Sequence, residues 1–92
     1  MLEGNALPRI EIYTQSGCAY CARALRLFSD KGVAVNEIDA PYGTRERSEA
    51  ERRSGGRTTV PQIFIDGRHV GGCDDLLALD RKGELDGLLR AA

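Results

Sequence analysis

Short apolar segments bounded by turn residues predict the strands of this chain. Ile10 and Ile12 alternate with polar neighbours in the first of these segments, and Tyr13 closes it. The Asp66-Gly67 pair predicts a tight turn that joins the last two strands as a hairpin. The predicted strands are Arg9–Thr14, Val33–Ile38, Gln62–Asp66 and Arg68–Val70.

Helical periodicity fills the segments between and after these strands. Cys21, Leu25 and Phe28 recur at i, i+4 and i+7 and predict one common face of a helix that Gly32 ends. Thr44 is the expected cap of a second, charged helix. The predicted helices are Ala19–Lys31, Thr44–Ser54, Cys73–Leu79 and Glu84–Leu89. The order β-α-β-α-β-β-α-α indicates one α/β domain whose single sheet has both parallel and antiparallel strands.

Composition and charge narrow the function classes. Because 13 Lys and Arg side chains stand against 14 Asp and Glu, nothing suggests a nucleic-acid partner, which a strongly basic face would recognise. The apolar runs are too short for a transmembrane span, and residues 1–8 lack the basic and apolar regions of a signal peptide. We therefore expect a cytoplasmic protein with no membrane partner, formed by a flexible N-terminal extension at 1–8 and a domain at 9–92.

Two of the three cysteines form a Cys-x-x-Cys pair, and the odd count argues against a disulfide-stapled secreted scaffold. Cys18 lies where a loop gives way to a helix, so its sulfur faces the free N–H groups of the first turn, which favour the thiolate. Cys21 lies three residues on, deeper along the buried face. We expect Cys18 to attack disulfides and Cys21 to resolve them. A zinc site that adds His69 and Cys73 to the pair is the alternative.

Three motifs follow one another along nearly the whole chain. They are Ile12-Tyr13-Thr14 leading to Cys18-Ala19-Tyr20-Cys21, then Arg57-Thr58-Thr59-Val60-Pro61-Gln62, and then Gly71-Gly72-Cys73-Asp74-Asp75. With them, the sequence closely resembles the dithiol glutaredoxins of the bacterial class I type. The resemblance implies a thioredoxin-like fold, a four-stranded mixed sheet flanked by helices, with a cis peptide bond before Pro61. It also implies a glutathione-dependent oxidoreductase that reduces protein disulfides and protein–glutathione mixed disulfides.

The same resemblance implies a glutathione site. Val60 would pair with the cysteinyl portion of glutathione, while the first turn at Cys73 and Asp74 would hold its γ-glutamyl end. The glutathione-binding residues that the resemblance implies are Gln15, Tyr20, Thr59, Val60, Pro61, Gly72, Cys73 and Asp74. The expected partners are glutathione and disulfide-containing or glutathionylated proteins, and the expected state is a monomer.

Two positions depart from the family pattern. Gln15 stands where many dithiol glutaredoxins have a lysine, so another cation, Arg57 or one from the helix between Arg45 and Arg53, is expected to replace it. A solvent-exposed face is the plainer interpretation of that arginine-rich helix. Ala19 stands where many have proline, and relatives with a small residue there can hold a [2Fe-2S] cluster between two protomers through the first cysteine, here Cys18, and glutathione. A cluster-binding dimer that acts as carrier or sensor is therefore the alternative function.

Overall fold

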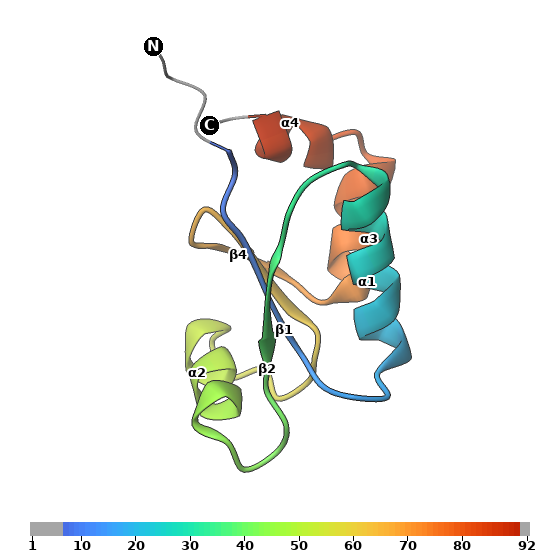
Figure 1. Ribbon diagram of the computed structural model, residues 1–92. Helices are drawn as coiled ribbons and strands as arrows, with labels where there is room; N and C mark the ends of the chain where they lie inside the picture. Colours follow the sequence, from blue (N-terminus) through green and yellow to red (C-terminus); the bar gives the residue numbers. More distant parts are fainter. Residues whose placement is uncertain (1–6, 91–92) are drawn as a thin grey trace.

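The computed structural model describes residues 7–90 and has one mixed sheet between two helical layers (Figure 1). The strands are β1 (Ile10–Thr14), β2 (Asn36–Asp39), β3 (Gln62–Ile65) and β4 (Arg68–Gly71), in the spatial order β2-β1-β3-β4. β1 pairs with β2 in parallel, and the other two pairings are antiparallel. The helices are α1 (Ala19–Asp30), α2 (Arg45–Arg53), α3 (Cys73–Arg81) and α4 (Leu85–Arg90). The predicted element order and thioredoxin-like α/β fold are confirmed.

Two apolar clusters hold the layers together. The larger cluster lies on the face that α1, α3 and α4 cover and includes Ile12, Phe28 and Leu76, none of which is exposed. The smaller lies under α2, where the Tyr13 and Phe64 rings pack edge to face at 5.8 Å between centroids. Because neighbouring strand residues point to opposite faces, Ile12 and Tyr13 of the same strand supply both clusters. No helix within residues 7–90 has the length and apolar character needed to cross a membrane.

The sequence prediction places the start of the second strand too early. β2 starts at Asn36, which pairs with Glu11, and not at Val33. The amide of Val33 donates to Phe28 O at the end of α1, so this segment still belongs to the helix terminus. Val33 and Val35 are apolar because they pack against the core, without joining the strand ladder. Apolar alternation indicates which residues pack against the core, and Val33 and Val35 do so without pairing in a strand. The first and last residues of a strand must be found from its pairing.

The ends of the molecule are described only in part. Residues 1–6 of the predicted flexible extension lie outside the described residues, and so do residues 91–92. Leu7 is exposed, and with Pro8 it borders a cavity that Gly32, Val33 and Ala34 complete. The division into an extension at 1–8 and a domain at 9–92 stays a prediction.

Candidate active site

The cysteine pair occupies the start of α1. Cys18 is the N-cap residue in extended backbone geometry, and its sulfur accepts a hydrogen bond from the Cys21 amide at 3.1 Å. The two cysteines are joined as a disulfide with their Cα atoms 5.2 Å apart. Cys21 is buried on the core side of the helix, whereas Cys18 is half-buried. The more accessible sulfur is thus the one that faces the N–H groups of the helix terminus, which stabilise negative charge.

The segment before β3 approaches Cys18 from the opposite side. The Val60–Pro61 peptide bond is cis, as the resemblance implied, and Pro61 is buried. Val60 O lies 3.8 Å from Cys18 Sγ. Thr59, the residue before, is exposed. The reactive sulfur and the backbone of the Thr59–Val60 segment therefore face one another.

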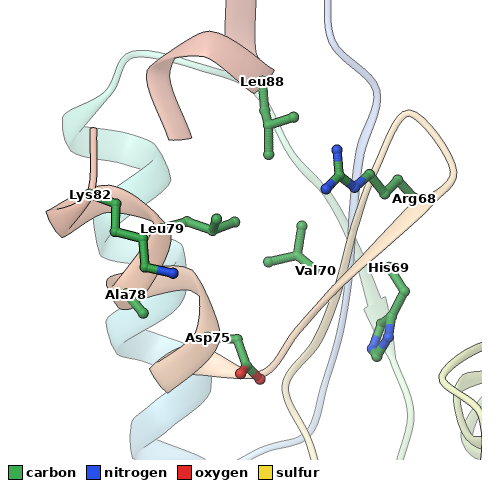
Figure 2. Close-up of a pocket in the computed structure, with 8 residues that line it drawn as sticks. All are labelled: Arg68, His69, Val70, Asp75, Ala78, Leu79, Lys82 and Leu88. Carbon is green, nitrogen blue, oxygen red and sulfur yellow. The ribbon is translucent and has the colours of Figure 1, made fainter. Parts of the chain in front are cut away.

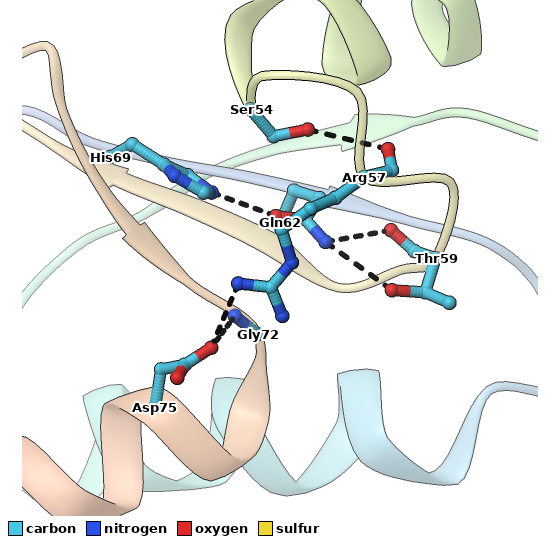
Figure 3. Close-up of polar contacts among 7 residues, drawn as sticks. All are labelled: Ser54, Arg57, Thr59, Gln62, His69, Gly72 and Asp75. Atoms are coloured by element: carbon cyan, nitrogen blue, oxygen red, sulfur yellow. Dashed lines mark hydrogen bonds and ion pairs between the residues drawn. The ribbon is translucent and has the colours of Figure 1, made fainter.

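The start of α3 lies beside this loop. It places Asp74 and Asp75 in different surroundings. The Asp75 carboxylate accepts from the Gly72 amide at 2.9 Å and pairs with Arg57 at 3.1 Å (Figure 3). These contacts, the amide first, hold the pKa of the Asp75 carboxyl below its ordinary value. Asp75 is therefore the capping residue, and Asp74 is exposed beside it. Cys73 is a buried free cysteine, and burial raises the pKa of its thiol.

Arg47 is a buried cation of the site region that the sequence did not single out. It is only 3% exposed, although α2 is otherwise rich in solvent-facing charges. Its guanidinium donates to Gln15 Oε1 at 2.8 Å, to Ala40 O at 2.9 Å and to Thr58 O at 2.9 Å. The Tyr42 ring covers it at 3.9 Å from Cζ to the centroid.

Arg47 is the cation that lies beside Gln15, the position where many relatives have lysine. Of the candidate cations, it is Arg47 that contacts Gln15, whereas Arg57 pairs with Asp75. The expectation of a wholly solvated arginine face on α2 is wrong at this position, since acceptors from three separate segments converge there. Within α2, the sequence gives no signal that sets Arg47 apart from the exposed Arg45 and Arg52, so its burial could not be predicted from the helix alone.

Comparison with known proteins places this geometry in a family. A family model described as Glutaredoxin matches residues 10–70. The chain belongs to the glutaredoxin family. It is 54% identical over 84 residues to Glutaredoxin 3 of Escherichia coli (strain K12), which covers 91% of this chain and all of the relative.

Two solved glutaredoxins share the fold. The solution structure of glutaredoxin from Brucella melitensis has a TM-score of 0.82 at 51% identity and covers 96% of this chain and 95% of its own. The crystal structure of the buckwheat glutaredoxin–glutathione complex has a TM-score of 0.78 at 28% identity and covers 89% of this chain and 76% of its own. The redox-active cysteine pair and the thioredoxin-like fold of an oxidoreductase are thus established for this chain.

The remaining predicted site residues fall around the cysteine pair in different ways. Tyr20 projects from the first turn of α1 and is 56% exposed, with the Arg23 guanidinium 5.7 Å from its ring centroid. Gln15, Cys18 and Cys21 border a groove of about 410 Å³ that extends toward Leu25 and Glu37. This groove and the Thr59–Val60 segment give access to Cys18 from two directions.

A smaller cavity of about 240 Å³ lies away from the cysteines, between β4 and the α3–α4 corner (Figure 2). Val70, Leu79 and Leu88 point into it, and charged side chains surround them. Neither Cys18 nor Cys21 lines it. We assign the chemistry to the cysteine groove, because it holds the nucleophile.

The zinc alternative does not assemble. Within residues 7–90, no group of three or more His, Cys, Asp and Glu side chains is placed to hold a metal ion. His69 Nε2 lies 2.8 Å from Gln62 Oε1, so the ring is engaged with an amide on β3.

Proposed function

We propose that this glutaredoxin is a glutathione-dependent thiol–disulfide oxidoreductase that reduces protein disulfides and protein–glutathione mixed disulfides. The observation that supports it most is the position of Cys18 Sγ. It accepts a hydrogen bond from the Cys21 amide at the start of α1 and lies 3.8 Å from Val60 O. A sulfur so placed is stabilised as a thiolate and lies beside a free peptide edge.

The reaction on a glutathionylated protein balances through two exchanges. The Cys18 thiolate attacks the glutathione sulfur, a Cys18–glutathione disulfide forms, and the protein cysteine leaves as a thiolate. A second glutathione thiolate then attacks the glutathione sulfur bound to Cys18. This step releases oxidised glutathione and regenerates the Cys18 thiolate, so one free glutathione thiol is consumed for each protein thiol released.

Reduction of a protein disulfide uses the second cysteine. Cys18 forms a mixed disulfide with one substrate sulfur, and Cys21 attacks Cys18 to release the reduced substrate. The resulting Cys18–Cys21 disulfide is the bond present in the structure. Two glutathione molecules return it to the dithiol and leave as oxidised glutathione.

The residues implied by the family resemblance form a cradle for glutathione. Val60 pairs its backbone with the cysteinyl portion of the tripeptide, and Tyr20 flanks the sulfur. At the start of α3, backbone amides and Gly72 receive the γ-glutamyl carboxylate, and exposed Asp74 meets the ammonium. The structural likeness to a glutaredoxin solved as a glutathione complex supports this assignment.

Gln15 and Arg47 bind the glycine carboxylate of glutathione. Because Gln15 Oε1 accepts from Arg47, the Gln15 amide group is left to donate. Arg47 adds a positive charge directly behind it. Together they replace the lysine that many relatives carry at the position of Gln15.

A glutathione-coupled disulfide reduction assay tests the proposal. We expect Cys18→Ser to abolish turnover, because it removes the nucleophile. Cys21→Ser should keep deglutathionylation and lose the reduction of protein disulfides that need both thiols. Ser16→Ala, in the same loop, is the control and should keep both activities. Turnover by Cys18→Ser, or electrons supplied by a thioredoxin reductase in place of glutathione, contradicts the proposal.

We further infer a cytoplasmic monomer, because the cysteines comprise a redox pair and one buried free thiol. The glutathione-ligated [2Fe-2S] dimer stays an alternative prediction. It would use Cys18 and glutathione thiolates from two copies of the chain. Anaerobic reconstitution with iron, sulfide and glutathione decides it, since a colourless monomer excludes the cluster.

A further inference from the structure

A fully buried amide lies directly behind the cis-proline loop. Gln62 is the first residue of β3 and has no exposed surface. Its Nε2 donates to Thr59 O at 3.0 Å and to Thr59 Oγ1 at 3.4 Å. On its other side, Gln62 Oε1 meets His69 Nε2 at 2.8 Å (Figure 3). A buried amide satisfied at both ends links β4 to the loop that faces Cys18.

The Thr59 carbonyl fixes which atoms donate and which accept in the hydrogen-bond series Thr59–Gln62–His69. Thr59 O can only accept, so the Gln62 amide must present its NH₂ group to the loop and its oxygen to His69. His69 must therefore carry a proton on Nε2. Burial, with Arg57 as the next cause, lowers the pKa of His69, so the ring is neutral at pH 7 with that single N–H. The ring is held against Phe64 at 5.0 Å between centroids.

We propose that His69 is a positioning residue that acts through Gln62 on the Thr59–Val60 segment. It fixes the amide so that the amide holds the Thr59 carbonyl, and thereby sets the backbone on which glutathione pairs. The inference rests on the proposed function, since it concerns the same cradle. His69 is on the edge strand and does not border the cysteine groove, so its effect passes through the buried amide.

Three variants separate positioning from general stability. His69→Phe keeps an aromatic ring against Phe64 but removes the N–H, and His69→Gln restores a donor. Val70→Ala is the control, because Val70 is the next residue of β4 and packs on the opposite face of the sheet. It weakens β4 without touching Gln62.

We measure kcat and KM for glutathione with each variant. His69→Phe should raise KM about fivefold, which is about 1 kcal/mol, while kcat stays within about twofold. His69→Gln should return KM to within about twofold of the wild type, and Val70→Ala should leave it there while lowering the Tm. An unchanged KM in His69→Phe, or an equal rise in Val70→Ala, overturns the positioning role.

The amide resonances of Thr59 and Val60 give a readout that does not need glutathione. They should shift in a ¹⁵N–¹H correlation spectrum of His69→Phe, return in His69→Gln and stay in place in Val70→Ala. A wild-type protein that does not use glutathione defeats the proposed function, while these shifts still decide the positioning. Resonances that do not move in His69→Phe overturn it, whether or not glutathione is the reductant.

Discussion

Replacing Arg47 by methionine removes a charge that three segments of the chain share. The guanidinium reaches Gln15 after β1, Ala40 after β2 and Thr58 before the cis peptide bond. Methionine retains an apolar stem of similar length, so the change removes the hydrogen bonds with little loss of packing. The perturbation therefore tests the polar contacts of Arg47.

The magnitude follows from the exposure of each acceptor. Ala40 has no exposed surface, so its carbonyl is left unsatisfied at a cost of about 1–3 kcal/mol. Thr58 is exposed, and water can take over most of that bond. Arg47 Nε has no hydrogen-bond partner among residues 7–90, and removing this buried donor regains about 1 kcal/mol. Together with the tether to Gln15, the net loss is about 2 kcal/mol. That is a substantial share of the roughly 5–14 kcal/mol expected for a domain of this size.

Urea unfolding monitored by circular dichroism measures this loss. With a slope of about 1–3 kcal/mol per molar urea, the midpoint should fall by about 1 M. Arg52→Met is the matched control, because Arg52 is an exposed arginine of the same helix and should change stability by less than about 0.5 kcal/mol. Equal losses in the two variants, or an Arg47→Met midpoint at the wild-type value, would refute the role of Arg47 as the buried tie between these segments.

Two further predictions concern the start of α3. Asp75→Asn should destabilise the protein most at pH values above the ordinary carboxyl pKa of 3.8, because the folded-state pKa of Asp75 lies below that value. The difference from wild type, measured by urea unfolding across pH, should shrink as the pH falls below 3.8 and vanish once the folded-state carboxyl is protonated. A difference that does not depend on pH would contradict this. Gly71→Ala should cost about 2 kcal/mol or more, since Gly71 has φ +121° and a Cβ there would lie 2.9 Å from Asp75 Cβ. Gly87→Ala in α4 is its control, with no atom within 4 Å of the added Cβ, and a loss of stability as large as that of Gly71→Ala would undermine the explanation.

Local chemistry made much of the fold predictable. Thr44 caps α2 by accepting from the Arg47 amide, as a threonine before a charged helix should. Asp66 and Gly67 both have positive φ, which is what a two-residue hairpin turn requires. Each of these features depends on neighbours within four residues, so the sequence alone specifies it. The start of β2 was misplaced because strand pairing with β1 is a long-range contact.

The site was predictable to the same degree. Cys18 as the helix cap follows from its place before α1, and its hydrogen bond to the Cys21 amide spans only three residues. The burial of Arg47 depends on acceptors that lie 32, 7 and 11 residues away in sequence. Nothing in the helix that carries Arg47 distinguishes it from the exposed Arg45 and Arg52. Only the assembled fold selects which arginine becomes buried.

This difference in range separates the nucleophile from the backbone that we propose binds glutathione. The thiolate of Cys18 is stabilised by its own helix, so a short local segment suffices for attack on a disulfide. The backbone that faces it is held from two sides, since Arg47 binds Thr58 O and Gln62 binds Thr59 O. Consecutive carbonyls of one loop are thus anchored to different elements, α2 and β3, immediately before Val60. Substitutions at these anchors should change the affinity for glutathione while leaving Cys18 reactive toward small disulfides, which makes preference for the reductant separable from thiol reactivity in this fold.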